Sequence, residues 1–250
     1  MEGLYGELVN LALSLARAKR VKKVLVGLFY TLAEVERTGY GLAYTPKELI
    51  EDCCGFAEGA LWREPADILV KKYLSSGVLE STVALAVINA LLNNRKEILR
   101  ETTTEDPLSN GKLTLQDEIL MIGYIEPIFK KLERKVGRIW LIEREGSQEG
   151  LKIITETGKI SLAIVTSATL VNKTFHKLVP YLEKIPEVIL MGPSTPLAPE
   201  LFKFTPVTWL SGVVVKEGDL LFRLICEGKG APVLFKSGAL QKVNLKIKRN

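Results

Sequence analysis

Apolar runs alternate with amphipathic segments through the second half of the chain. Continuous apolar runs predict strands that are covered on both faces, and segments with a single apolar side predict helices between them. The expected strands lie at residues 118–125, 138–145, 159–166, 187–192 and 206–215. The expected helices lie at residues 126–137, 167–178 and 217–230. This alternation predicts an α/β domain with a doubly wound, parallel sheet.

The first half shows a different pattern. It opens with an amphipathic helix, followed by two expected strands at residues 22–36 and 39–46, joined by a turn at Thr38 and Gly39. The segment 81–94 is apolar on nearly every side, which predicts a buried helix. Its one interior amide, Asn89, must find partners. Asn89 either ties the helix to a neighbouring backbone or reaches a ligand at a domain junction.

A polar segment rich in turn formers separates the two halves. Residues 101–113 (ETTTEDPLSNGKL) lack apolar periodicity. We therefore place a domain boundary there. The expected division is a smaller α+β domain over residues 1–108 and an α/β domain over residues 109–250.

The fourth expected strand of the second half ends in Met191 and is followed by Gly-Pro-Ser-Thr-Pro. Pro193 has no N–H for a strand ladder, so the strand must stop here. Ligands of open parallel sheets lie beyond the carboxyl ends of the strands. Gly192, Pro193, Ser194 and Thr195 are therefore candidate ligand-binding residues, and a plain rigid turn is the alternative.

Small hydroxyl residues also follow the third expected strand, in TSATLVNKT (residues 166–174). Such residues cap the amino termini of helices. Capping accounts for Ser167 or Thr169, but not for Asn172 as well. We take Thr169 and Asn172 as candidate ligand contacts, with solvation as the alternative for Asn172.

Two acidic residues lie at the ends of the first two expected strands of the second half. Glu126 opens the first helix, and Glu143 ends the second strand twenty positions after Gly123. An acid at that spacing accepts hydrogen bonds from ribose in dinucleotide-binding folds, but the Gly-x-Gly-x-x-Gly loop is absent. A nucleoside-type cofactor therefore stays an alternative. No Ser/His/Asp or Cys/His catalytic set can be assembled around the single His176.

The net charge of +5 lies in the last fifteen residues. That stretch holds five basic residues and no acid, in an alternating pattern typical of an edge strand protected by lysines. We expect no nucleic-acid partner, because aromatic residues are not interleaved with the basic ones. No apolar run is long enough to span a membrane and no secretory leader is evident, so we expect a cytoplasmic protein. Cys53 and Cys54 are expected to be free thiols rather than a zinc site, with a soft metal ion as the alternative.

Several motifs together resemble one family. The segments MIGYIEPIFKKL, TSATLVNKTF, MGPSTPLAPELF and WLSGVVV occur in this order, after VGLFYT, GYGLAYTP and AVINALL. The chain resembles the "putative heavy-metal chelation" family, whose members join an enolase N-terminal-like domain to a Rossmann-like domain.

The resemblance implies a cleft between the two domains that binds a small molecule. The residues that it would place along the cleft are Tyr44, Thr45, Asn89, Gly123, Glu126, Glu143, Thr169, Asn172, Gly192, Pro193, Ser194 and Thr195. One histidine and three cysteines make a cage of soft ligands hard to build. A metal held by carboxylates or carried inside an organic chelator agrees better with this composition.

Three hypotheses follow. The first is a protein that binds or processes a small polar ligand between the domains, such as a metal ion, a metal chelate or another anionic molecule. The second is an enzyme with a nucleoside-type cofactor such as S-adenosylmethionine. The third is a non-catalytic assembly subunit with a closed, dry junction. Assembly into a homo-oligomer is left open.

Overall fold

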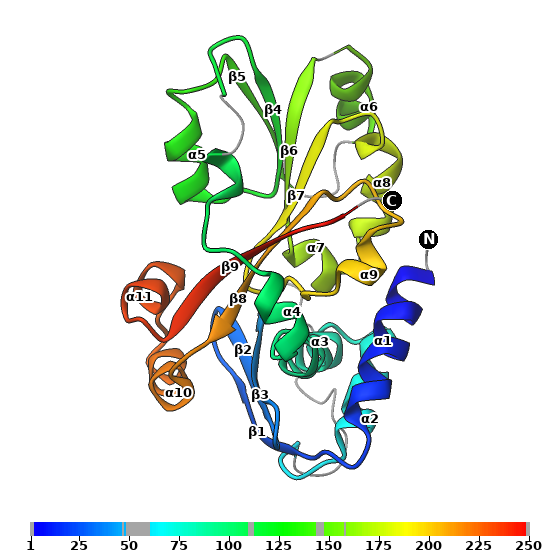
Figure 1. Ribbon diagram of the computed structural model, residues 1–250, viewed down its shortest axis with the longest axis vertical. Helices are drawn as coiled ribbons and strands as arrows, with labels where there is room; N and C mark the ends of the chain where they lie inside the picture. The colour runs from blue at the N-terminus through cyan, green and yellow to red at the C-terminus, as the bar shows by residue number, and fades with distance from the viewer. Residues whose placement is uncertain are drawn as a thin grey trace.

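The structure, a computed structural model, describes residues 3–46, 48, 61–109, 113–143, 148–157 and 159–248. Its strands form two sheets, one of three antiparallel strands and one of six mostly parallel strands (Figure 1). The mixed α/β fold with a parallel sheet in the second half is as the sequence predicts.

The three-stranded sheet corrects one prediction. The expected single strand at residues 22–36 is a hairpin of two strands, broken at residues 27–29. Gly27 donates its N–H to the carbonyl of Tyr30, which reverses the chain. The strands of the sheet are β1 (Val21–Val26), β2 (Tyr30–Val35) and β3 (Gly39–Tyr44).

Every residue of β2 is buried, because both faces of this sheet are covered. The helix α3 (Val78–Leu92) packs on the face formed by Ala33, Val35 and Ala43. Its expected burial on all sides is confirmed, since α3 also contacts α1 (Gly3–Ala16) and α2 (Ala66–Lys71).

The six-stranded sheet has the order β5-β4-β6-β7-β8-β9. All neighbouring strands are parallel except β8 and β9, and the lysine-rich β9 forms one edge, as predicted. Numbered within the sheet, the order of the parallel strands is 2-1-3-4-5, a common doubly wound arrangement. The strands are β4 (Glu118–Ile122), β5 (Arg138–Ile142), β6 (Ile160–Thr166), β7 (Glu187–Met191), β8 (Trp209–Val215) and β9 (Leu240–Lys246).

Helices cover both faces of the parallel strands (Figure 1). On one face, α5 (Glu126–Leu132) packs through Leu132 on Ile119 and Met121. On the other face lie α6 (Gln148–Thr157), α8 (Phe175–Leu182) and the short α9 (Pro199–Phe202). Short elements connect these layers: η2 (Lys72–Leu74), α4 (Lys96–Glu101), η3 (Pro107–Ser109) and α7 (Ala168–Val171).

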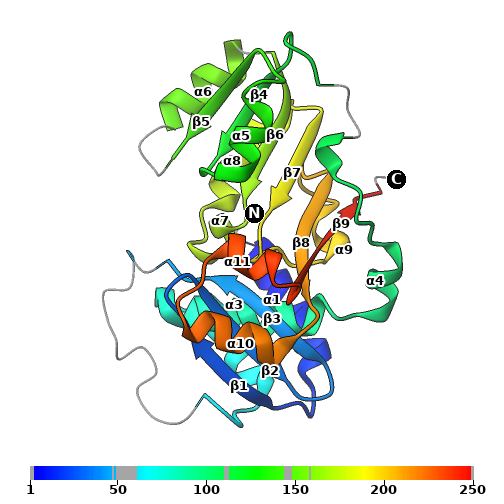
Figure 2. The ribbon, with the colours of Figure 1, turned by 90° about the vertical axis from the view of Figure 1, so that its left-hand side faces the viewer.

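The end of the chain returns to the first sheet. The helices α10 (Gly218–Cys226) and α11 (Ala231–Lys236) lie against β1–β3 on the face opposite α3 (Figure 2). Leu221, Ile225 and Leu234 pack there with Leu32 and Leu42. The chain after residue 216 therefore completes the core of the N-terminal sheet, which the expected single helix at 217–230 does not reveal.

Of the segment 101–113, where we expect the domain boundary, the structure describes residues 101–109 and 113. Thr103 pairs with Asn244 of β9 through two backbone hydrogen bonds of 2.8 Å. The connection between the halves is thus attached to the edge of the second sheet. Within the described part of the chain, no helix has the length and apolar character needed to cross a membrane.

Candidate functional site

A cavity of about 730 Å³ lies at the carboxyl edge of the parallel strands, facing the first sheet. Loops after β4, β5, β6 and β7 form one side of it. Tyr30 and Tyr44 of the first sheet and residues of α11 form another. In the strand order, β4 and β6 are the neighbours from which the crossovers diverge, and ligands of doubly wound sheets bind at that point.

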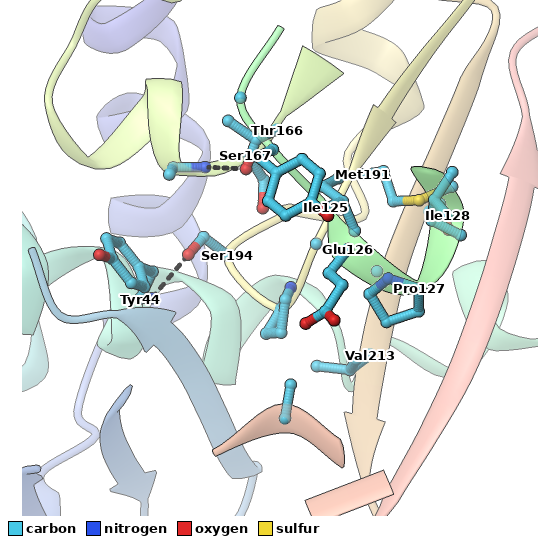
Figure 3. A pocket seen from close by; sticks show the side chains of 18 of the residues that line it. Tyr44, Ile125, Glu126, Pro127, Ile128, Thr166, Ser167, Met191, Ser194 and Val213 are labelled. Atoms are coloured by element: carbon cyan, nitrogen blue, oxygen red, sulfur yellow. Dashed lines mark hydrogen bonds between the residues drawn. The ribbon is translucent and has the colours of Figure 1, made fainter. Parts of the chain in front are cut away.

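The first three residues of the Gly-Pro-Ser-Thr-Pro loop, Gly192, Pro193 and Ser194, line the cavity. Gly192 adopts φ +137°, and a Cβ atom there would lie 2.5 Å from Ser167 Oγ. Ser194 Oγ accepts a hydrogen bond of 2.7 Å from the backbone N–H of Tyr44 (Figure 3). This bond joins the parallel sheet's loop to the end of β3, so Ser194 links the two sheets.

Amide side chains at the end of α3 hold this loop from behind. Asn89 Nδ2 donates to the carbonyls of Leu42 (2.9 Å) and Ser194 (3.1 Å). Asn93, one turn later, donates to Thr195 O (3.0 Å) and accepts from the N–H of Leu197 (2.7 Å). The Asn89 side chain therefore binds neighbouring backbone carbonyls, which is one of the two roles that the sequence leaves open for it.

An ion pair continues this attachment beyond the helix. Arg95 donates to the carbonyl of Leu197 (2.7 Å) and to the carboxylate of Glu200 (2.5 Å). Because the Arg95 side chain is mostly buried, the pair fixes the loop's exit into α9.

Some of the polar residues after β6 line the cavity, and others stabilise the turn behind it. Thr166, Ser167 and Ala168 line the cavity. Thr169 is buried and donates its hydroxyl to the carbonyl of Thr166 (2.7 Å). Asn172 is exposed and its amide lies 2.8 Å from the Thr174 hydroxyl, so it serves the local turn.

The two acids predicted at strand ends both reach the cavity. Gly123 adopts φ +80° and turns the chain after β4, which places Glu126 on the wall. Figure 3 shows the Glu126 carboxylate pointing into the cavity on the side of Val213. Glu126 also pairs with Lys130 at 2.5 Å. Glu143 follows β5 directly and lines the same cavity.

The structure brings together seven of the twelve sequence-predicted residues. The residues that line the cavity are Tyr44, Gly123, Glu126, Glu143, Gly192, Pro193 and Ser194. The residues outside its lining are Thr45, Asn89, Thr169, Asn172 and Thr195. Thr45 is buried and its hydroxyl bonds that of Thr31 at 2.9 Å, and Thr195 is buried behind the loop.

Other lining residues were not predicted as ligand-binding. They include aromatic residues and the β8–β9 ribbon: Tyr30, Tyr124, Phe235, Ser211, Val213 and Lys242. The small residues Ser211 and Gly212 in the middle of an apolar strand were a usable signal. Phe235 gave none, because its place depends on the packing of α11 on a distant sheet.

The charge at one end of the cavity comes from Lys242. Its ammonium lies 4.0 Å from Asp106 Oδ1, and Lys131 of α5 bonds the other oxygen of the same carboxylate. Burial lowers the pKa of Lys242 although Asp106 opposes this. Burial would raise the pKa of Asp106, but the bonds from Lys131 and the Leu108 N–H outweigh it and the pKa is lowered.

Tyr30, a buried tyrosine of the cavity wall, has a shifted pKa. Burial, and then the neighbouring Tyr44, raises the pKa of Tyr30 from 10.0 to about 12. Between those values the unfolded chain ionises this phenol and the folded chain does not. The contribution of the protonated Tyr30 phenol to the stability of the fold is therefore fully present below pH 10 and is lost as the pH rises toward 12.

We expect Tyr30→Phe to reduce the loss of stability between pH 10 and 12 by about 2 kcal/mol, because the whole two-unit shift corresponds to about 2.7 kcal/mol and most of it is lost within this range. Urea unfolding at pH 9 and at pH 11.5, with wild type in parallel, measures the difference. An equal loss in both proteins would contradict the assignment to Tyr30.

The described residues contain no group of three or more His, Cys, Asp or Glu side chains that could hold a metal ion. Cys53 and Cys54 lie outside the described residues, and Cys226 is exposed on α10. His176 lies on α8, where its ring nitrogen is 3.2 Å from the Tyr5 hydroxyl, and it does not line the cavity. Among the residues that the structure describes, the cavity wall offers two carboxylates, those of Glu126 and Glu143.

Fold and cavity together define a two-sheet α/β protein with a ligand-sized site at the carboxyl edge of its parallel sheet. The chain belongs to the DUF364 family, whose model, described as "Putative heavy-metal chelation", matches residues 106–244. A second model with the same description, DUF4213, matches residues 9–92. The resemblance seen in the sequence is thereby confirmed.

Two solved structures share the fold. A DUF364-family protein of unknown function from Pyrococcus horikoshii is 22% identical with a TM-score of 0.81, and the match covers 98% of this chain and 100% of that one. A DUF364-family protein of unknown function from Desulfitobacterium hafniense is also 22% identical, with the same coverage and a TM-score of 0.79. A comparison with curated proteins returns no match.

Proposed function

We propose that this protein binds a small organic molecule in the cavity between its two sheets. The main support for this proposal is the cavity itself, because its volume of about 730 Å³ lies within the range typical of small-molecule sites. Its wall is mostly apolar and aromatic, with a few polar groups converging from different loops. An assembly subunit would instead be expected to have a closed, dry junction.

The family description suggests which molecules to consider. A bare heavy-metal ion is a poor match for a wall whose described donors are mainly hydroxyls and two carboxylates, because soft metals prefer thiolate and imidazole. An organic chelator that surrounds the metal with its own donors would present an apolar exterior to Tyr30, Tyr44 and Tyr124. We therefore propose a chelator, or its metal complex, as the ligand class.

A nucleoside-type cofactor is the second candidate, and Glu143 is the observation that favours it. Glu143 follows the second strand of the parallel sheet and lines the cavity. Acids at that position accept hydrogen bonds from ribose hydroxyls in related arrangements. The loop at Gly123 lacks the further glycines of a dinucleotide site, so this candidate ranks below the first.

Blocking the cavity tests the proposal. Ala231 lines the cavity at the start of α11, whereas Val233 of the same helix is 43% exposed and does not line it. A panel of metal ions, metal chelates, pterins and adenosine-containing cofactors would be screened by thermal shift. We expect any stabilising compound to lose at least tenfold in affinity with Ala231→Trp, because the indole would fill its space, and to keep its affinity with Val233→Trp.

The unfolding midpoint of each variant without ligand shows whether the substitution has damaged the fold. A compound that binds Ala231→Trp as tightly as wild type occupies another site and contradicts the proposed location. If no compound of the panel stabilises the wild-type protein at millimolar concentration, the proposed ligand classes are wrong.

A further inference from the structure

One face of the β8–β9 ribbon forms the end wall of the cavity. Ser211 pairs with Asn244 and Val213 pairs with Lys242 across the two strands. Directly opposed residues, and residues two apart along a strand, point to the same face of a sheet. Ser211, Val213, Lys242 and Asn244 therefore share one face, and the first three line the cavity.

The Ser211 side chain lacks a partner although it is buried. The residue is 2% exposed, and its Oγ makes no hydrogen bond to any described part of the chain. Asn244, directly opposite, is fully buried; its Nδ2 donates to Glu105 O at 2.7 Å, and its Oδ1 is also unpartnered among the described residues. Buried polar groups in folded proteins are nearly always hydrogen-bonded, so an unpartnered hydroxyl on a cavity wall points to a ligand.

Two lysines next to the end wall share one carboxylate. Lys242 and Lys131 share the single carboxylate of Asp106. Lys242 is the member of this group that lines the cavity, and its ammonium is 4.0 Å from Asp106, longer than a hydrogen bond. The end wall thus offers a partly desolvated cation and a hydroxyl donor, a pair suited to an anionic oxygen group.

We propose that the end wall of the cavity is an anion subsite, in which Lys242 and Ser211 bind a carboxylate or phosphate group of the ligand. The inference deepens the proposed function and rests on it. The rest of the ligand would lie against the tyrosines, and any hydrogen-bond donors that it carries would face Glu126 and Glu143. The ligand class is therefore an organic anion with an apolar or aromatic body.

Simple probes test the subsite without knowledge of the natural ligand. Benzoate and phenyl phosphate carry an anion on an aromatic ring, and benzamide is a neutral molecule of nearly the same shape as benzoate. We expect benzoate or phenyl phosphate to bind at least tenfold more tightly than benzamide in titrations followed by NMR. The stronger of the two anions identifies carboxylate or phosphate as the preferred group.

Three variants locate the anion. Lys242→Met, which keeps the apolar stem, should weaken the preferred anion at least tenfold and leave benzamide unchanged. Ser211→Ala should weaken it several-fold and, because it removes an unpartnered hydroxyl, raise the unfolding midpoint of the free protein. The matched control is Lys246→Met: Lys246 lies on the same strand and face, stacks on Trp209 and does not line the cavity, so no change is expected.

The outcomes separate the two proposals. Equal binding of benzoate and benzamide, or an anion preference that survives Lys242→Met, would overturn the anion subsite while leaving a small-molecule cavity in place. A wild-type protein that binds none of the three probes and no compound of the wider panel would overturn the proposed function as well. A lower unfolding midpoint for Ser211→Ala would show that the hydroxyl has a structural role and would overturn its assignment to a ligand.

Discussion

Replacement of Gly41 by alanine is expected to destabilise the protein by about 4 kcal/mol, at the upper end of what single substitutions cause. Gly41 lies on β3 where α3 crosses it. A Cβ atom there would lie 2.0 Å from Ala90 N and 2.1 Å from Ala86 O. Both atoms belong to the helix backbone, so no side chain can move aside to make room.

The physical consequence is a displacement of α3 from the first sheet. That helix is buried along nearly its whole length and touches β2, β3, α1 and α2. Moving it by more than an ångström would open the core between Ala33, Ala43 and the helix, which costs dispersion and hydrophobic free energy. Urea unfolding measured by circular dichroism gives the change in free energy.

Gly6→Ala is the matched control. Gly6 lies within α1, and a Cβ atom there would have nothing within 4 Å. Alanine is the better helix former by up to ~1 kcal/mol, so this variant is expected to be slightly more stable than wild type. If Gly41→Ala unfolds at the same urea concentration as Gly6→Ala, the close approach of β3 and α3 does not exist.

The parallel sheet could be predicted because its strands are buried on both faces. The runs ILMI, LAIV and VILM have no polar residue to place outward, and strands of this kind occur under helices on two sides. Pro193 and Gly192 marked the end of β7 for a local reason, since proline cannot continue a ladder. Features that depend only on residues close in the sequence could therefore be predicted.

The misplaced or undetected features depend on contacts between distant parts of the chain. The sequence around Gly27 is apolar throughout, so nothing local distinguishes a hairpin from one long strand. The helices α10 and α11 look like ordinary amphipathic helices, and only the structure shows that their apolar sides belong to the N-terminal sheet. The side of the cavity that α11 forms could not be predicted for the same reason.

Within the candidate site, Asn89 shows most clearly what the sequence alone cannot predict. An amide within an apolar helix must have partners, but its sequence does not say whether they are backbone or ligand. The structure places its Nδ2 on Leu42 O and Ser194 O, while the carbonyl oxygen of its side chain is buried without a partner among the described residues. Asn89 supports the cavity from behind, and ligand contact by this residue remains only a prediction.

Asn93→Ala is expected to lower the stability by about 3 kcal/mol and to weaken any ligand of the cavity. Asn93 is 3% exposed. Its loss would leave the carbonyl of Thr195 and the N–H of Leu197 buried without the partners that they now have. Each buried polar group left unpaired costs about 1–3 kcal/mol.

The functional part of this prediction follows from the position of the bonds. They hold the segment that continues directly from Gly192, Pro193 and Ser194, so their removal frees the cavity wall between β7 and α9. A loop that must be ordered by the ligand binds it less tightly, because the ordering entropy is then lost on binding. Thermal unfolding and ligand titration of the same samples measure the two effects.

Asn94→Ala separates the loop effect from a general weakening of α3. Asn94 Nδ2 donates to Tyr40 O (3.0 Å) and Ala90 O (2.7 Å), so these bonds go to the first sheet and to its own helix. We expect a loss of about 1 kcal/mol for this half-buried neighbour and an unchanged ligand affinity. If both substitutions change ligand affinity equally, the bonds of the Asn93 side chain do not position the cavity wall. The shape of the loop after β7 would then be due to its own prolines.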